Sequence, residues 1–331
     1  MLSYKVPVLA GVAFALLALA PLGSARDINT IGATEKVVFN FDGSDGFEPT
    51  GVIFDAAGNL YGTTTMGSKK GCYDQFGCGL VFELMPNGKV GWTEKILYEF
   101  GPDSNDGIYP NGGLVFDTAG NLYGLTSGGG QQGCTSDGLC GTVFKLTPTA
   151  HGRWIKQVLH YFDANGKDGN DPTAGLVMDA HGNLYGTTYY GGTGSCSDGN
   201  GVGCGTVFEL SPPTRKGGKW TETILYSFQN NATDGIWPDA TLLLDASGNL
   251  YGENWGGGSG GNGTVFELVR KKGTWTERIL HSFSGKDGVN PGAGLVFDAD
   301  GDLYSTTSSG GTGGCSIGGY PGCGTVFRIR P

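Results

Sequence analysis

The tetrapeptide Gly-Asn-Leu-Tyr stands at residues 58–61, 120–123, 182–185 and 248–251, and Gly-Asp-Leu-Tyr stands at residues 301–304. A short apolar run ending in Asp precedes each copy, as in GLVFD before the second, and a run such as GTVF follows it. Short apolar runs between glycine-rich turns are typical of β-strands. Recurrence of one unit in the same order indicates a tandem-repeat architecture. Five units, each with three short strands, are anchored at Asn59, Asn121, Asn183, Asn249 and Asp302.

A fourth strand follows in four of the units. Runs that alternate apolar and polar residues, as half-buried strands do, begin at Trp92, Trp154, Trp220 and Trp275. The last unit lacks such a run, whereas residues 36–41 (KVVFNF) match it. A closed ring hides its edge when a strand from one end completes the blade at the other. We therefore predict an all-β fold, a five-bladed β-propeller of four-stranded blades, closed by the N-terminal strand completing the last blade.

The chain begins with the features of a secretory signal peptide. Lys5 provides a positive charge, residues 6–19 are apolar, and residues 23–25 are small, as a cleavable signal requires. We expect cleavage near Ala25 and secretion to the periplasm or the extracellular space. A short lead over residues 26–35 and a single propeller domain over residues 36–331 would follow.

Composition restricts the expected partners. The formal net charge of −10 argues against nucleic acid, because phosphate backbones attract basic surfaces. No run after the signal reaches the roughly 18 apolar residues of a membrane span, so we expect no membrane insertion. A glycan or an extracellular protein is the expected partner, and the protein is expected to be a monomer.

The repeated unit GLVFDAxGNLYGTT followed by GTVF resembles the GloVer (Gloeo-Verruco) tandem-repeat family of secreted bacterial proteins, over residues 36–331. The resemblance implies an extracellular repeat protein. It carries no catalytic residue over to this chain.

Eight cysteines form four close pairs between the second and third strands of their units, and the fourth unit lacks both cysteines. If the disulfides are local, both cysteines of a unit should be present or absent together, as they are here. Zinc is the rival interpretation, but the pairs belong to different blades and have no nearby histidine. The predicted bonds are Cys72–Cys78, Cys134–Cys140, Cys196–Cys204 and Cys315–Cys323.

No resident cofactor is expected, although calcium stays open as an alternative. An aspartate precedes glycine at the same position of every unit, and five carboxylates around one axis would suit calcium. Asp-Gly is also ordinary turn chemistry, which we consider the better explanation. These residues are Asp45, Asp106, Asp168, Asp234 and Asp287.

Aromatic residues that differ between repeats mark a candidate binding surface. The disulfide loops and the Asp-Gly loops should emerge on one face of a propeller, and such variable loops on a rigid scaffold commonly carry function. Aromatic faces there could stack on sugar rings, or they could fill the top of the central channel instead. The candidates are Trp237, Trp255, Tyr189, Tyr190 and Tyr109.

Three acidic residues that break the repeat are weak catalytic candidates: Glu253, Asp171 and Glu48. Two such groups could serve as the acid and base of a glycoside hydrolase, although solvated loop acids are more common. The histidines lie in predicted turns or outer strands, where we expect neither a catalytic nor a metal role. They are His151, His160, His181 and His281.

Three functions remain open from the sequence. A secreted module that binds a glycan or a surface protein through the loop face needs only the aromatic residues and a rigid fold. A carbohydrate-active enzyme needs a converging carboxylate pair. A structural role in the cell envelope or matrix is the third. We rank binding first and an enzyme below it.

Overall fold

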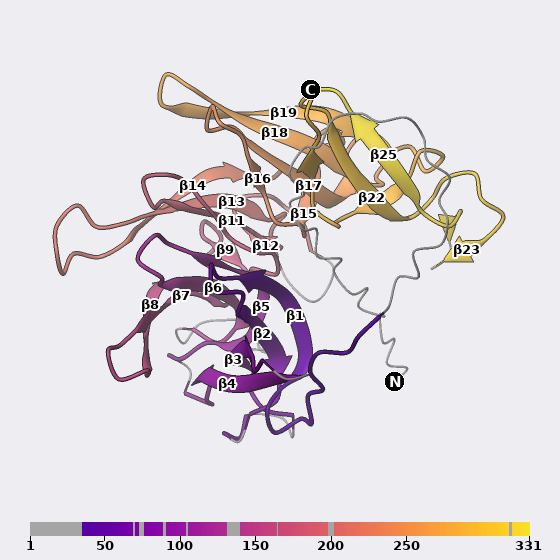
Figure 1. Cartoon of the computed structure of the whole chain (residues 1–331). Coiled ribbons are helices and arrows are strands. Elements are labelled where there is room, and N and C mark those ends of the chain that lie inside the picture. The colour runs from indigo at the N-terminus through magenta and orange to yellow at the C-terminus, as the bar shows by residue number, and fades with distance from the viewer. Residues whose placement is uncertain are drawn as a thin grey trace.

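The computed structural model describes residues 35–331, apart from 69, 73–75, 89–90, 104, 131–139, 164, 198–201 and 318–319. Within these residues the chain forms antiparallel β-sheets and no helix. The sheets are arranged as the five blades of a β-propeller (Figure 1), which confirms the predicted fold class. In the described part of the chain no helix could span a membrane. The signal predicted over residues 1–25 lies outside the described residues.

The first two blades consist of four consecutive strands, in chain order across the sheet. Blade 1 contains β1 (Phe47–Phe54), β2 (Leu60–Met66), β3 (Leu80–Pro86) and β4 (Trp92–Glu99). Blade 2 contains β5 (Ile108–Phe116), β6 (Leu122–Gly128), β7 (Thr142–Pro148) and β8 (Trp154–Tyr161).

The first strand is divided into two pieces in the remaining blades. Blade 3 contains β9 (Gly169–Asn170), β10 (Val177–Met178), β11 (Leu184–Thr188), β12 (Tyr190–Gly191), β13 (Thr206–Ser211) and β14 (Thr221–Ser227). Blade 4 contains β15 (Gly235–Pro238), β16 (Leu243–Leu244), β17 (Leu250–Gly257), β18 (Thr264–Lys271) and β19 (Thr274–Ser282). Blade 5 contains β20 (Val289–Pro291), β21 (Val296–Phe297), β22 (Leu303–Ser309), the short pair β23 (Ser316–Ile317) and β24 (Tyr320–Pro321), and β25 (Thr325–Ile329).

The Asp-x-x-Gly-Asn-Leu-Tyr motif forms the turn between the first two strands of a blade. In blade 2, Asp117 accepts hydrogen bonds from the Asn121 backbone N–H (2.9 Å), the Asn121 side chain (2.6 Å) and the Tyr123 hydroxyl (2.9 Å). Gly120 has φ of 80°, which glycine adopts readily. Burial alone would raise the pKa of Asp117, but these hydrogen bonds outweigh it and hold the pKa below its ordinary value. The most repeated motif is thus a structural turn.

Successive blades pack through a pair of phenylalanines. The phenylalanine at the end of an outer strand contacts that of the next blade's third strand, with ring centroids 5.2–5.3 Å apart in Phe100–Phe144, Phe162–Phe208 and Phe228–Phe266. The glycine of each Leu-Tyr-Gly gives the ring room, because a Cβ on Gly124 would lie 2.6 Å from Cζ of Phe144.

The N-terminal segment takes the same packing position against blade 1. Phe41 contacts Phe82 at 5.1 Å between ring centroids, as an outer strand of blade 5 would. However, residues 35–46 form no strand, and β25 pairs only with β22 among the described strands. The predicted closure by a hydrogen-bonded strand over residues 36–41 is therefore not formed.

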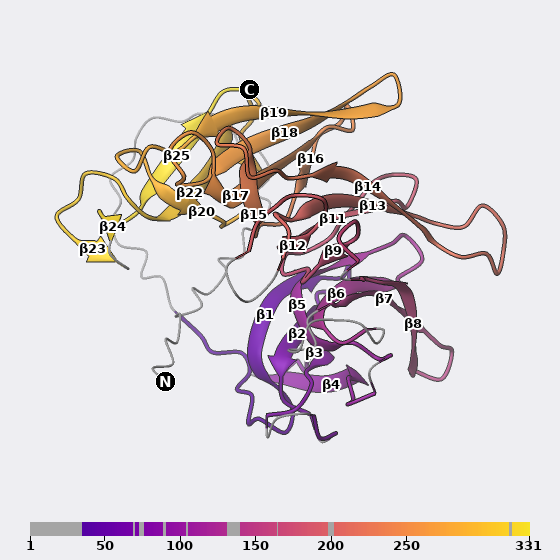
Figure 2. The ribbon, with the colours of Figure 1, turned by 180° about the vertical axis from the view of Figure 1, so that it is seen from behind.

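The reason lies in the separation of blades 5 and 1. Val81, Val143, Val207 and Val265 are each 0% exposed, whereas Val326, the equivalent residue of β25, is 78% exposed. Paired strands must lie about 4.8 Å apart. The partly buried Phe39 and Phe41 pack on blade 1 and hold the N-terminal segment there, and Figure 2 shows this segment apart from β25. The ring thus has an open seam between its first and last blades.

Candidate functional site

One position of each repeat has the same unusual backbone. The residue before the proline of the inner strand has φ between 56° and 59° in every blade. Such values are uncommon outside glycine, and residues held in them cluster at ligand sites. Four of the sequence candidates occupy this position, and the fifth blade adds Asn290, which no sequence signal marked. The five residues are Glu48, Tyr109, Asp171, Trp237 and Asn290.

The disulfide loop of the preceding blade holds this position. The backbone N–H of Tyr109 donates to the Cys78 carbonyl at 3.0 Å, and that of Trp237 donates to the Cys204 carbonyl at 2.8 Å. In blade 4, which lacks cysteines, the Asn262 carbonyl takes the same role toward the next blade. The loops of blades 1 to 4 therefore each position a variable side chain of the next blade.

Three of the predicted disulfides are present: Cys72–Cys78, Cys196–Cys204 and Cys315–Cys323. The fourth predicted bond includes Cys134, which lies outside the described residues. Disulfides persist in oxidising compartments, so these bonds are consistent with an extracellular or periplasmic protein.

A glycine of the loop also packs closely on the proline of the next blade. A Cβ on Gly205 would lie 2.5 Å from Cδ of Pro238 and 2.6 Å from the Thr188 carbonyl oxygen, and Gly205 has φ of 93°. We expect Gly205→Ala to lower the free energy of unfolding by roughly 3 kcal/mol, through overpacking and backbone strain together. Gly182→Ala is the control, because Gly182 has a similar φ of 83° and no atom within 4 Å of the added carbon. Urea denaturation would measure the free energy of unfolding of both variants. An equal decrease in the two would show that the steric contact with Pro238 is unimportant.

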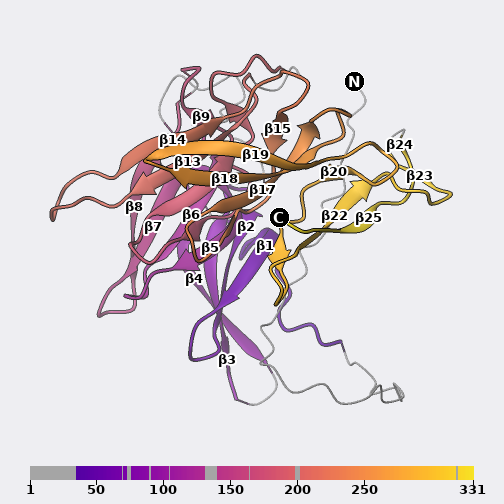
Figure 3. The same ribbon diagram turned by 90° about the horizontal axis from the view of Figure 1, so that it is seen from above.

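The aromatic candidates of blades 3 and 4 come together in the structure. The Tyr189 and Trp237 rings are stacked, with centroids 5.9 Å apart and planes 7° from parallel, and Trp255 lies 6.3 Å from Trp237. Trp255 is 36% exposed, and Tyr189 and Trp237 are half-buried. We call Tyr189, Trp237 and Trp255 the aromatic platform. Trp237 lies within β15 and Trp255 within β17, whereas Tyr189 stands between β11 and β12. Figure 3 shows β15 on the same side of the molecule as β9.

The other two aromatic positions of the candidate set differ. Tyr190 is only 5% exposed and lies edge-on to Tyr189 at 4.8 Å, so it supports the platform from within. Tyr109 packs against the apolar core between blades 1 and 2. The platform therefore belongs to blades 3 and 4.

Polar groups flank the platform. The Tyr189 backbone N–H donates to the Asp171 carbonyl at 3.0 Å, and the Asn290 amide donates to the Trp255 carbonyl at 2.7 Å. The indole Nε1 of Trp237 is shielded from solvent and has no hydrogen-bond acceptor among the described residues. An apolar surface with a few polar groups at its edges is typical of a binding site.

The carboxylate candidates lie in different environments. Glu253 is 1% exposed and accepts a hydrogen bond from the Gly294 backbone N–H at 2.8 Å, so it joins blade 4 to blade 5. Burial raises its pKa to about 7. Burial, and then the charge of Asp239, raises the pKa of Asp171 to about 7. Glu48 is exposed at the open seam.

Asp239 is a carboxylate that the sequence reasoning missed. It stands one residue after Pro238 and accepts a hydrogen bond from the Thr173 hydroxyl of blade 3 at 2.7 Å. No other unit has an acidic residue at this position, which holds Thr50, Asn111, Thr173 and Gly292. Comparison of the repeats could therefore have identified Asp239.

The Asp-Gly aspartates are bound within their own loops. Asp106 accepts from the Gly101 N–H at 2.9 Å, and Asp234 accepts from the Gln229 N–H at 2.8 Å. Each such aspartate thus fastens a loop at a different blade seam.

Two surface hollows lie at the turns between the first two strands. One is lined by Asp245, Tyr251, Asp298 and Arg330 of blades 4 and 5, and the other by residues of blades 2 and 3 that include Trp220. Neither hollow includes a residue of the platform.

Fold, loops and platform together define a disulfide-bonded tandem-repeat propeller with a candidate binding surface on one face. The sequence matches the Gloeobacter/Verrucomicrobia repeat over residues 22–214 and 141–331. The chain therefore belongs to this repeat family.

Solved structures with similar folds have low sequence identity to this chain. A protein of unknown function from Dyadobacter fermentans DSM 18053 is 12% identical, with 82% of this chain and 77% of that chain covered and a TM-score of 0.49. A glucose dehydrogenase is 14% identical, with coverage of 87% and 84% and a TM-score of 0.48. An endo-arabinase from Bacteroides thetaiotaomicron VPI-5482 is 12% identical, with coverage of 87% and 95% and a TM-score of 0.40. A search of curated proteins gave no match.

Proposed function

We propose that this protein is a secreted binding module that recognises carbohydrate through the aromatic platform. The observation that carries the proposal is the parallel stack of Tyr189 on Trp237 beside the exposed ring of Trp255. Flat aromatic faces pack on the apolar faces of sugar rings at low entropic cost. Asp171 and Asn290 flank the platform and would supply polar contacts to hydroxyl groups.

Rigidity supports the same proposal. The backbone N–H of Trp237 is held by the carbonyl of Cys204, whose disulfide to Cys196 closes the loop. Tyr190 packs beneath the stack. A site that is already ordered loses less entropy when its ligand binds.

A glycoside hydrolase is the second candidate function, favoured by one observation. Asp171 has a pKa of about 7, and its charged neighbour is Asp239. A carboxyl group that keeps its proton near neutral pH beside a second carboxyl group suits acid catalysis of glycoside cleavage. Glu253 is a poorer participant, because it is buried in the seam with blade 5.

The test is a glycan array and a reducing-sugar assay, run with protein purified from the culture medium of cells that express the full chain. We expect Trp255→Ala to weaken binding about tenfold, equivalent to about 1.4 kcal/mol. Trp237→Gly should weaken it similarly, and glycine is chosen there because φ is 59°. Trp154→Ala is the control, since Trp154 begins an outer strand in blade 2.

The outcomes separate the two functions. Binding without sugar release, lost in both platform variants and retained in Trp154→Ala, supports the binding module. Release that disappears in Asp171→Asn supports the hydrolase. Binding that persists in Trp255→Ala and Trp237→Gly would refute the platform as the site.

A further inference from the structure

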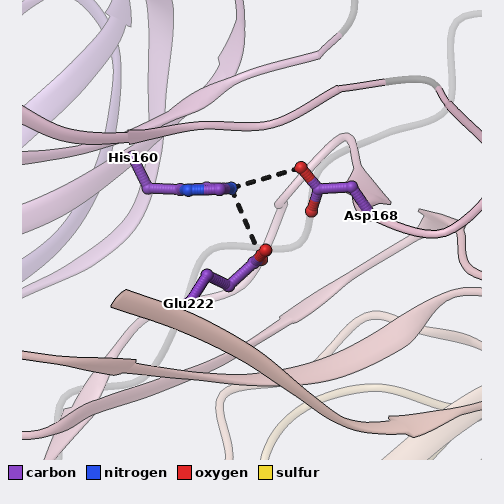
Figure 4. Close-up of side chains that lie close together, drawn as sticks. All are labelled: His160, Asp168 and Glu222. Carbon is purple, nitrogen blue, oxygen red and sulfur yellow. Dashed lines mark hydrogen bonds and ion pairs between the residues drawn. The ribbon is translucent and has the colours of Figure 1, made fainter. Parts of the chain in front are cut away.

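Three side chains meet at the seam between blades 2 and 3. His160 of β8 lies with its Nε2 3.3 Å from Oδ2 of Asp168 and 3.4 Å from Oε1 of Glu222. Asp168 belongs to the loop before β9, and Glu222 belongs to β14. All three potential ligand atoms lie within 4.8 Å of one another. Figure 4 shows the imidazole and the two carboxylates pointing toward one another.

We propose that His160, Asp168 and Glu222 bind a divalent transition-metal ion such as Zn²⁺ between blades 2 and 3. Zinc binds imidazole nitrogen and carboxylate oxygen at about 2.0–2.2 Å. Two ligands at that distance in a tetrahedral arrangement lie about 3.3–3.5 Å apart, close to the separations of His160 from both carboxylates. One imidazole and two carboxylates suit zinc and its first-row neighbours better than the all-oxygen set of calcium.

The other seams have the same three positions with different chemistry. Between blades 1 and 2 the positions hold Tyr98, Asp106 and Lys156, and the Lys156 ammonium lies 2.8 Å from Oδ1 of Asp106. A positive charge therefore already occupies this place in one seam. At the seam between blades 2 and 3, Glu222 stands at the position of Lys156 and His160 at the position of Tyr98. This seam therefore lacks the lysine charge and has an imidazole that can bind a metal ion.

The next seams serve as natural controls. Between blades 3 and 4 the Tyr226 hydroxyl lies 3.1 Å from Asp234 and 3.0 Å from Glu277, so two carboxylates are present without an imidazole. Between blades 4 and 5, His281 lies 2.8 Å from Asp287, with no glutamate from an outer strand of blade 5 in the described structure. Within the described residues, only the His160 seam combines all three ligands.

Electrostatics at the His160 seam also call for a cation. Oε1 of Glu222 is shielded from solvent and accepts no hydrogen bond within the described part of the chain. Two adjacent, partly buried carboxylates are costly unless a positive charge compensates them. A divalent ion would supply that positive charge.

The three groups remain accessible to an ion. Their side chains are 19%, 10% and 15% exposed for His160, Asp168 and Glu222. Water could complete the coordination, as in zinc sites with three protein ligands. The ion would join an outer strand of blade 2 to an outer strand of blade 3, so its expected effect is on stability rather than on the platform.

The test is isothermal titration of ZnCl₂ into the untagged mature protein after treatment with EDTA, at pH 7.5. We expect one ion per chain and a higher thermal midpoint when zinc is present. His160→Ala and Glu222→Gln should each weaken binding at least tenfold, as the loss of one of three ligands requires. His281→Ala and Glu277→Gln are the matched controls, and both should bind zinc like the unaltered protein.

A second measurement uses the unaltered protein and does not depend on how well the variants fold. In the unaltered protein, zinc should move the NMR resonance of the His160 imidazole Nε2 and leave that of His281 in place. No saturable binding, or binding unchanged in His160→Ala, would overturn the proposal. Glycan binding should not depend on zinc, so the result is independent of the proposed function.

Discussion

Replacement of Phe208 by alanine is expected to lower the free energy of unfolding by about 3–5 kcal/mol, the usual cost of removing a buried phenylalanine. Phe208 is 0% exposed, and its ring lies 5.2 Å from that of Phe162 in the preceding blade. Gly186 leaves room for its tip, since a Cβ there would lie 2.6 Å from Cζ. Alanine would leave a cavity between two rigid sheets, which can close only in part.

Phe327→Ala is the matched control for this prediction. Phe327 has the same position in blade 5 and the same contact with a neighbour, Phe283 at 5.1 Å. It is only partly buried, because blade 5 ends at the open seam. Chemical denaturation should show that Phe327→Ala costs less than half as much as Phe208→Ala. Equal costs would contradict the open seam and would mean that blade 1 covers Phe327 in solution.

The protein is expected to become less stable as the pH rises from about 5 to 8. Burial raises the pKa of Glu253 from 4.5 to about 7, and burial, followed by the charge of Asp234, raises the pKa of Glu277 to about 8. Such a group keeps its proton in the folded state and loses it on unfolding above pH 4.5. Stability is therefore full below pH 4.5 and falls as the pH passes the folded-state pKa. The pKa shift of Glu253 alone corresponds to a loss of roughly 3 kcal/mol in the free energy of unfolding.

The opposite trend is expected at lower pH. Hydrogen bonds outweigh burial and hold the pKa of Asp117 and Asp179 below the ordinary value. Their contribution is present above about pH 4 and is lost as the pH falls through the folded-state pKa. Urea midpoints measured from pH 3 to pH 8 should thus be highest near pH 5.

Glu253→Gln separates this explanation from a general effect of charge. Glutamine keeps an oxygen that can accept the hydrogen bond from Gly294 and has no proton to lose, so the variant should be more stable than the unaltered protein at pH 8. Glu48→Gln removes an exposed carboxylate and should leave the pH dependence in place. An identical slope in Glu253→Gln and the unaltered protein would show that Glu253 is ionised in the folded state.

Local repetition made most of the fold predictable. The Asp117 turn and the three described disulfides depend on residues within one repeat. The closing strand was harder to predict. The segment 36–41 has the right residues and Phe41 has the right contact, but strand pairing depends on the distance between the first and last blades. No residue of the segment encodes that distance.

The candidate site was predictable only where repeats could be compared. Trp237 and Trp255 stood out because other repeats have different residues there, and the structure brings them within 6.3 Å. The burial of Glu253 could not be read from a turn-rich sequence, since it depends on which face of β17 meets blade 5. The His160 cluster depends on how one outer strand lies against the next. Its members come from two repeats, so a search for local motifs missed it.

The exposed Val326 has a consequence for how the five blades share stability. A closed ring of five units has five interfaces between neighbours, whereas an open row has four, and its terminal unit is held from one side only. In such a row, stability is nearly a sum of unit and nearest-neighbour terms. Among the described residues, blade 5 then has one neighbouring blade, and its last strand, β25, has an unpaired edge at Val326. Loss of structure would begin there, and blade 4, which carries Trp237 and Trp255, would be the next to lose a neighbour.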